Sequence, residues 1–160
     1  LDNPRYYYLS SINNLAYTLE GLGKYKDAYD LYEEVANDEQ LFDVDPDLYV
    51  IAVGNVARLK FMIDETRAQE AKNILYNTLK ITDSLDDTIN EMGIYGFLAD
   101  IYDKTNQKDS ALYFFKKTNR NFFKGFKKST SKFQYSSFSK KKSPPLKRSF
   151  CFLLFGKASM

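Results

Sequence analysis

Apolar residues recur every three or four positions between residues 4 and 120, which places them on one face of successive α-helices. Polar and turn-forming residues separate these segments. The pattern predicts an all-α chain with helices at about 4–21, 24–38, 46–62, 66–81, 86–104 and 107–120.

Several residues mark the expected helix ends. Asn3-Pro4 and Asp45-Pro46 each place a capping side chain before a proline at the first helical position, where the missing N–H costs nothing. Gly21 and Gly23 end the first helix. The predicted cap of the fifth helix is Asp83 or Asp86, and that of the sixth is Asn106.

One arrangement of alanines occurs three times. The alanine pairs are Ala16 and Ala28, Ala57 and Ala71, and Ala99 and Ala111. The first alanines are 41 and 42 residues apart, and the two members of a pair are separated by 12 or 14 residues. A small side chain lets two helices approach closely, while a large residue one turn later fills the adjoining hole. We therefore expect three units at about 4–40, 45–81 and 85–120, each a pair of antiparallel helices.

Each predicted helix also has an apolar stripe that we expect to be buried. In the first helices the stripes are Tyr8, Ile12, Leu15, Ala16 and Leu19, then Tyr49, Val53, Val56 and Ala57, then Tyr95, Leu98, Ala99 and Tyr102. In the second helices they are Tyr25, Ala28, Tyr32 and Val35, then Ala68, Ala71, Leu75 and Thr78, then Ala111, Phe115 and Thr118.

The repeated residues resemble those of a known family. Leu15-Ala16 followed by Lys24-Tyr25-Lys26-Asp27-Ala28, and Leu98-Ala99 followed by Asp109-Ser110-Ala111, are similar to the tetratricopeptide repeat (TPR). The middle unit is a weaker match, with Lys60 at an apolar position and two extra residues in its turn. The resemblance implies a right-handed α-solenoid of about three repeats, in which the first helix of each unit lines a concave face.

The resemblance also indicates a binding face. Mapped onto this sequence, the concave face carries Asn13, Asn14, Tyr17, Asn55, Arg58, Phe61 and Asp100. The asparagine amides suit an extended peptide backbone, Arg58 suits a carboxylate, and the aromatic rings suit apolar contacts. Gly54, Gly93 and Gly96 would let a ligand approach closely. The alternatives are local capping by the asparagines, a surface ion pair for Arg58 and packing between units for Tyr17.

Composition argues against catalysis. The chain has no histidine and one cysteine, and it lacks a phosphate-binding loop, a nucleophile motif and zinc-ligand spacing. Asp43, Asp45 and Asp47 alternate, but no central glycine and no distal glutamate complete a calcium loop, so we expect them to cap the next helix. We expect no enzyme activity, no metal, no cofactor and no small-molecule substrate.

Charge divides the chain near Arg120. Residues 1–115 contain 10 basic and 21 acidic residues, whereas residues 116–160 contain 13 basic residues and no acidic one. We expect a helical domain at 1–120 and a disordered basic tail at 121–160. The tail is a nucleic-acid or membrane arm, an unfolded extension, or the product of a shifted reading frame. Its apolar run 150–155 is shorter than the roughly 20 residues that span a bilayer.

The expected function is a scaffold that binds a protein or peptide. A second hypothesis, again by resemblance, is the sensory input of a bacterial histidine kinase or helix-turn-helix regulator that contains such repeats. A third is nucleic-acid binding through the tail. Because the chain begins at Leu1, we expect a fragment or processed product; a cytoplasmic location is favoured, with the periplasm as the alternative.

Overall fold

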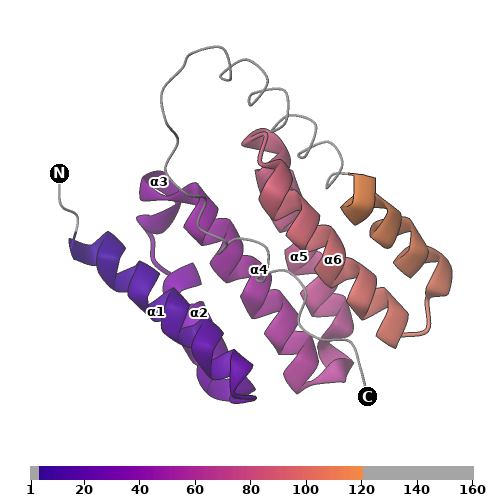
Figure 1. Ribbon diagram of the computed structural model, residues 1–160, viewed down its shortest axis with the longest axis horizontal. Helices are drawn as coiled ribbons and strands as arrows, with labels where there is room; N and C mark the ends of the chain where they lie inside the picture. Colours follow the sequence, from indigo (N-terminus) through magenta and orange to yellow (C-terminus); the bar gives the residue numbers. More distant parts are fainter. Residues whose placement is uncertain (1–3, 121–160) are drawn as a thin grey trace, which may run out of the picture.

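The computed structural model describes residues 4–120, and the regular elements in this range are all helical. They are α1 (Pro4–Gly21), α2 (Tyr25–Ala36), α3 (Leu41–Val44), α4 (Pro46–Ile63), the 3₁₀ helix η1 (Glu65–Arg67), α5 (Ala68–Ser84), α6 (Thr88–Lys104) and a helix at 108–120 (Figure 1). The all-α prediction is confirmed for the described residues, and every predicted long helix is present. The predicted cap Asn3 and the predicted tail at 121–160 lie outside the described residues.

Side-chain caps define the starts of two of the α-helices. Asp45 Oδ1 accepts a hydrogen bond from the Leu48 amide at 2.9 Å, so the predicted cap before Pro46 is confirmed. The cap of α6 is Asp87, whose Oδ1 accepts from the Asn90 amide at 3.0 Å, and the prediction of Asp83 or Asp86 is wrong.

Three helices end in the same backbone motif, with one residue in the left-handed region. These residues are Gly23 (φ 75°), Asp86 (φ 52°) and Asn106 (φ 60°). The next N–H donates to a carbonyl five residues back: Lys24 to Leu19 at 2.9 Å, Asp87 to Thr82 at 3.0 Å, and Gln107 to Tyr102 at 2.8 Å. This Schellman motif satisfies carbonyls that a helix end leaves free. Asn106 therefore closes α6, and Gln107, not Asn106, directly precedes the helix at 108–120.

The repeated alanines lie in the core. Five of the six have no exposed surface, and Ala111 is 2% exposed. Ala16 and Ala28 pack in one cluster with Tyr32 and Val56, whereas Ala57, Ala71 and Ala99 pack in another with Leu75 and Leu98. The prediction that small residues sit where helices approach one another is confirmed.

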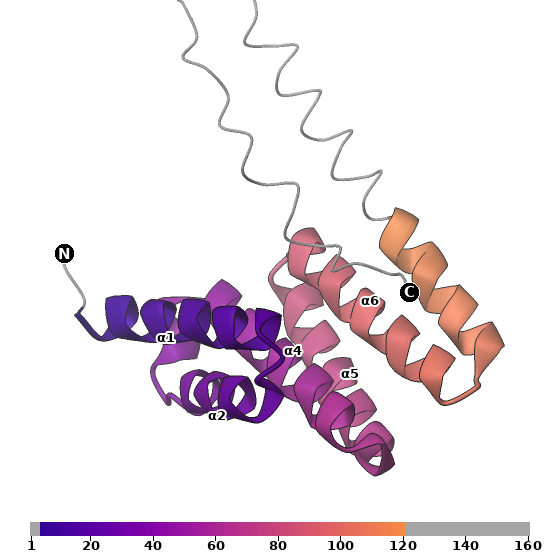
Figure 2. The same ribbon diagram turned by 60° about the horizontal axis from the view of Figure 1, so that its bottom comes forward.

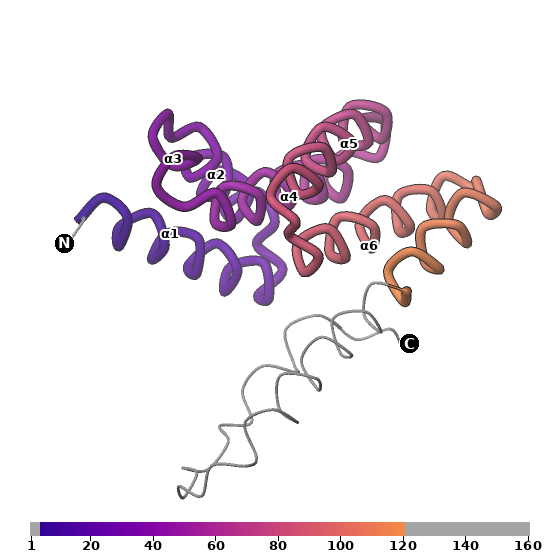
Figure 3. The backbone as a smooth tube through the Cα atoms, turned by 90° about the horizontal axis from the view of Figure 1, so that it is seen from above, coloured from indigo at the N-terminus to yellow at the C-terminus, as the bar shows by residue number. Residues whose placement is uncertain are grey.

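Helices pack against their neighbours in chain order. α2 lies against α1 and α4, and α5 lies against α4 and α6 (Figures 1 and 2). Seen from above, α1 and α6 lie on one side and α2 and α5 on the other, with α4 between them (Figure 3). We term the side formed by α1, α4 and α6 the first-helix side.

Four residues of the predicted apolar stripes are exposed rather than buried. They are Tyr8, Leu15, Tyr25 and Phe115, with exposed fractions of 53%, 51%, 39% and 43%. Tyr25 is the first residue of α2. The other three lie on α1 and on the helix at 108–120, which stand at the two ends of the series in the described part of the chain (Figure 1). One apolar face of each of these helices therefore stays exposed. In the helix at 108–120, Phe114 rather than Phe115 enters the core, at 6% exposure.

Candidate functional site

Arg58 lies on α4 and contacts all three helices of the first-helix side. Its Nη2 donates to Glu20 Oε2 on α1 at 2.5 Å and to Asn55 Oδ1, one turn earlier on α4, at 3.1 Å. Its guanidinium carbon lies 5.0 Å from the centre of the Phe97 ring on α6. The Arg58 and Glu20 side chains are only 17% and 18% exposed, so this ion pair is largely removed from water. A partly buried pair of this kind fixes the positions of the helices that carry it.

The Arg58 guanidinium therefore already has a carboxylate partner within the chain. The sequence left two possibilities for Arg58, a ligand carboxylate or an ion pair with a neighbouring acid. In the structure Glu20 occupies the position that a ligand carboxylate would take. A ligand with a free carboxylate would have to displace Glu20, which makes such a ligand a poor fit to this face.

Two polar atoms on this side are buried without a hydrogen-bond partner among the described residues. They are Arg58 Nε and Asn13 Oδ1. An unsatisfied buried donor or acceptor costs about 1–3 kcal/mol, and such atoms are typical of places where an added group completes the bonding.

Two other predicted site residues face solvent. Asn14 and Tyr17 lie on α1, and Tyr17 is 49% exposed. Asn55, which aligns with Asn14, differs because it is partly buried and its amide oxygen accepts from Arg58. The two asparagines therefore have different surroundings, and Asn14 is the more accessible of the pair.

Phe61 and Gly54 have packing roles in this structure, contrary to the roles expected from the sequence. Phe61 is 2% exposed within the core, and its ring lies 5.8 Å from Lys104 Nζ, so it offers no surface to a ligand. A Cβ added at Gly54 would lie 2.8 Å from Ile94 Cδ1, so this glycine admits α6 rather than a ligand. Gly93 and Gly96 differ, since a Cβ added there meets nothing within 4 Å.

Asp100 completes the predicted set on α6. It is an exposed residue whose carboxyl is partly shielded by neighbours, and this desolvation raises its pKa above the ordinary value. Lys104 and Arg58 act in the opposite direction, while Asp103 raises the pKa further. The attraction of Lys104 and Arg58 is therefore too weak to offset the desolvation of the Asp100 carboxyl.

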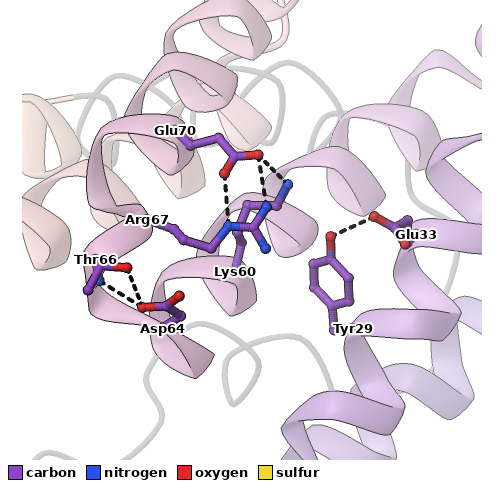
Figure 4. A network of polar contacts seen from close by, with 7 residues as sticks. All are labelled: Tyr29, Glu33, Lys60, Asp64, Thr66, Arg67 and Glu70. Carbon is purple, nitrogen blue, oxygen red and sulfur yellow. Dashed lines mark hydrogen bonds and ion pairs between the residues drawn. The ribbon is translucent and has the colours of Figure 1, made fainter.

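A second polar cluster surrounds the turn between α4 and α5 (Figure 4). Glu70 accepts from Arg67 Nε at 2.8 Å and from Lys60 Nζ at 2.7 Å, and these bonds, that from Arg67 foremost, lower the pKa of Glu70 to about 2. Asp64 accepts from the Thr66 amide at 3.0 Å, which starts η1. The two extra residues of the middle unit are thus held in a short 3₁₀ helix.

Beside this cluster is a cavity of about 190 Å³ between α2, α4 and η1. It is lined by Lys26, Tyr29, Asp30, Lys60, Ile63, Asp64 and Arg67. Burial, and then the hydrogen bond that Tyr29 donates to Glu33, raise the pKa of Tyr29 to about 12. Glu70 already binds Lys60 and Arg67, and the carboxylates of Asp30 and Asp64 line the wall, so the cavity offers an ionic ligand little net charge.

Sequence reasoning missed this cluster, although the three-residue spacing of Arg67 and Glu70 on one helical turn was a usable signal.

Within residues 4–120, no three cysteine or acidic side chains come together in a way that could hold a metal ion. In the same residues, no helix combines the length and the apolar character needed to cross a membrane.

Comparison with known proteins finds no matching family model, no matching curated protein and no matching solved structure. The resemblance to the tetratricopeptide repeat therefore depends on the repeated residues alone and stays a prediction.

Proposed function

We propose that this chain is a scaffold of tetratricopeptide-like helix pairs, wound as a right-handed solenoid, that binds an extended protein or peptide segment on its first-helix side. The observation that carries the proposal is the cluster around Arg58. It fixes α1, α4 and α6 relative to one another through one partly buried side chain. A surface that is rigid before binding loses less conformational entropy when a ligand associates.

The surroundings of this cluster favour a ligand that is held by amide and ring contacts. Asn14 and Tyr17 are exposed on α1, and the helix surface at Gly93 and Gly96 is open. A side-chain amide can both donate to and accept from a peptide backbone, and an exposed tyrosine supplies apolar contact area at low entropic cost.

The electrostatics favour a ligand with basic side chains and no free carboxylate at this face. Glu20 already neutralises Arg58, whereas the raised pKa of Asp100 shows that Lys104 and Arg58 do not offset the desolvation of its carboxyl. Residues 1–115 also carry an excess of acidic over basic residues, 21 against 10. A lysine or arginine of the ligand beside Asp100 would relieve this imbalance.

Peptide selection from a displayed random library against the full chain tests the proposal. Selected peptides should be enriched in Lys or Arg, and their affinity should fall about tenfold or more in an Asn14→Ala/Asn55→Ala variant that keeps its helicity. The matched control is Asn73→Ala/Asn77→Ala, which removes two exposed asparagines from α5 on the opposite side. Enrichment of no peptide, or equal loss of affinity in both double variants, would refute binding on the first-helix side.

A further inference from the structure

The residue before the first alanine of each unit is apolar in all three units but is covered in only two. Val56 on α4 is 8% exposed and Leu98 on α6 is 0% exposed, whereas Leu15 on α1 is 51% exposed. Val56 and Leu98 each pack in a cluster with residues of the second helix of the preceding unit. α1 presents the same kind of face, and in the described residues no second helix of a preceding unit covers it.

The opposite end of the series has the complementary feature. Tyr32 on α2 and Leu75 on α5 lie four residues after the second alanine of their units and are 1% and 0% exposed. The equivalent residue, Phe115, is 43% exposed, and Leu112, three residues earlier on the same helix, is 52% exposed. Tyr32 shares a cluster with Val56, and Leu75 shares one with Leu98. At each internal junction, therefore, the residue equivalent to Phe115 packs in one cluster with the residue equivalent to Leu15.

We infer that the α1 face around Leu15 binds the helix 108–120 face around Phe115 of a second copy of this chain, head to tail. The contact would repeat the junctions that the molecule already makes between α2 and α4 and between α5 and α6. Two different faces of one chain that fit each other form a heterologous contact, which leaves a free face at each end for further copies.

Charge favours this pairing over contact between two 108–120 helices. α1 contains one basic and one acidic residue, Arg5 and Glu20, and each is paired within the chain, whereas residues 108–120 contain four basic residues and one acidic residue. Two basic 108–120 helices would repel each other, but the neutral α1 face does not repel one. The inference does not depend on the proposed peptide binding, because neither face lies at the Arg58 cluster.

Sedimentation velocity of the full chain and of three variants tests the inference. Leu15→Glu blocks the α1 face, and Phe115→Glu blocks the face of the helix at 108–120. Ile89→Glu is the control, since Ile89 is 72% exposed at the start of α6. All three sites are exposed, so circular dichroism should show unchanged helicity. The wild type and the control should assemble as concentration rises. Each blocked variant alone should stay monomeric at the concentrations where the wild type assembles, because its self-association should be at least about tenfold weaker.

An equimolar mixture of Leu15→Glu and Phe115→Glu gives the decisive result. In this mixture Phe115→Glu keeps an intact α1 face and Leu15→Glu keeps an intact 108–120 face. The two variants should therefore form a 1:1 dimer and nothing larger. A mixture that stays monomeric would overturn the inference. So would a wild type that is monomeric at every concentration, as expected if residues 121–160 cover Phe115. Assembly of Phe115→Glu alone would indicate a symmetric α1–α1 contact and would equally overturn it.

Discussion

Two glycines near the end of α1 should respond to the same substitution with opposite signs. A Cβ added at Gly21 or at Gly23 meets no atom within 4 Å, so neither substitution creates a clash. Gly21 is the last residue of α1, and alanine there should stabilise the protein by about 0.5–1 kcal/mol because it costs less backbone entropy in a helix. Gly23 has φ 75°, and alanine in the left-handed region costs about 1–2 kcal/mol. The smaller entropy of the unfolded alanine chain offsets part of that cost, which leaves a net loss of about 1 kcal/mol.

Urea denaturation followed by circular dichroism measures both effects. The unfolding midpoint of Gly21→Ala should rise and that of Gly23→Ala should fall, with an unchanged dependence on urea. The difference in unfolding free energy between the two variants should be about 1.5–2 kcal/mol. Equal shifts of the same sign would show that the backbone conformation at Gly23 does not control the stability of this turn.

Three further predictions concern the core and the charges. Ala57→Leu should lower the unfolding free energy by about 1–3 kcal/mol in the same urea assay, because Ala57 is 0% exposed and a larger side chain cannot fit; an unchanged midpoint would contradict the close packing. Asp100→Asn should raise the thermal midpoint at pH 7, because a carboxyl whose pKa is raised by folding destabilises the folded state above that pKa. The gain should vanish below about pH 3, where the carboxyl is protonated in both states, and a gain independent of pH would refute the electrostatic cause. Glu70→Gln should lower the midpoint at pH 7, because the pKa of Glu70 is lowered to about 2. The ionised Glu70 stabilises the fold above the unfolded pKa of about 4.3, and this effect disappears as the pH falls through about 2. A midpoint of Glu70→Gln that stays below that of the wild type at lower pH would contradict the ionic cause.

Helix positions and the core alanines could be predicted from the sequence because both depend on local spacing. The 3.6-residue period and the Asp45-Pro46 signal depend only on neighbouring residues, and the structure confirms both. The turn at Asp86 could not be predicted, because aspartate seldom takes a positive φ and no glycine marks the position. At Asp86 the backbone hydrogen bonds that close the end of α5 outweigh the preference of aspartate for a negative φ.

The candidate site was harder to predict because it depends on contacts between helices. The resemblance to the tetratricopeptide repeat implied that Arg58 lies on the side formed by the first helices, but it did not indicate that Glu20 would bind Arg58. Whether a stripe residue is buried depends on whether a neighbour covers it. For this reason Leu15 was predicted as core and is exposed, although its equivalents Val56 and Leu98 are buried.

The central position of α4 has a consequence for how the molecule opens. α4 packs against α2, α3, η1, α5 and α6, whereas α1 packs mainly against α2. Separation of α1 uncovers the residues of α2, α3 and α4 that it covers but leaves α5 and α6 packed, whereas opening α4 requires the elements on both sides of it to separate. Backbone amides of α4 should therefore exchange with deuterium most slowly, and those of α1 much faster, so that the first-helix side loses one wall before the remainder unfolds.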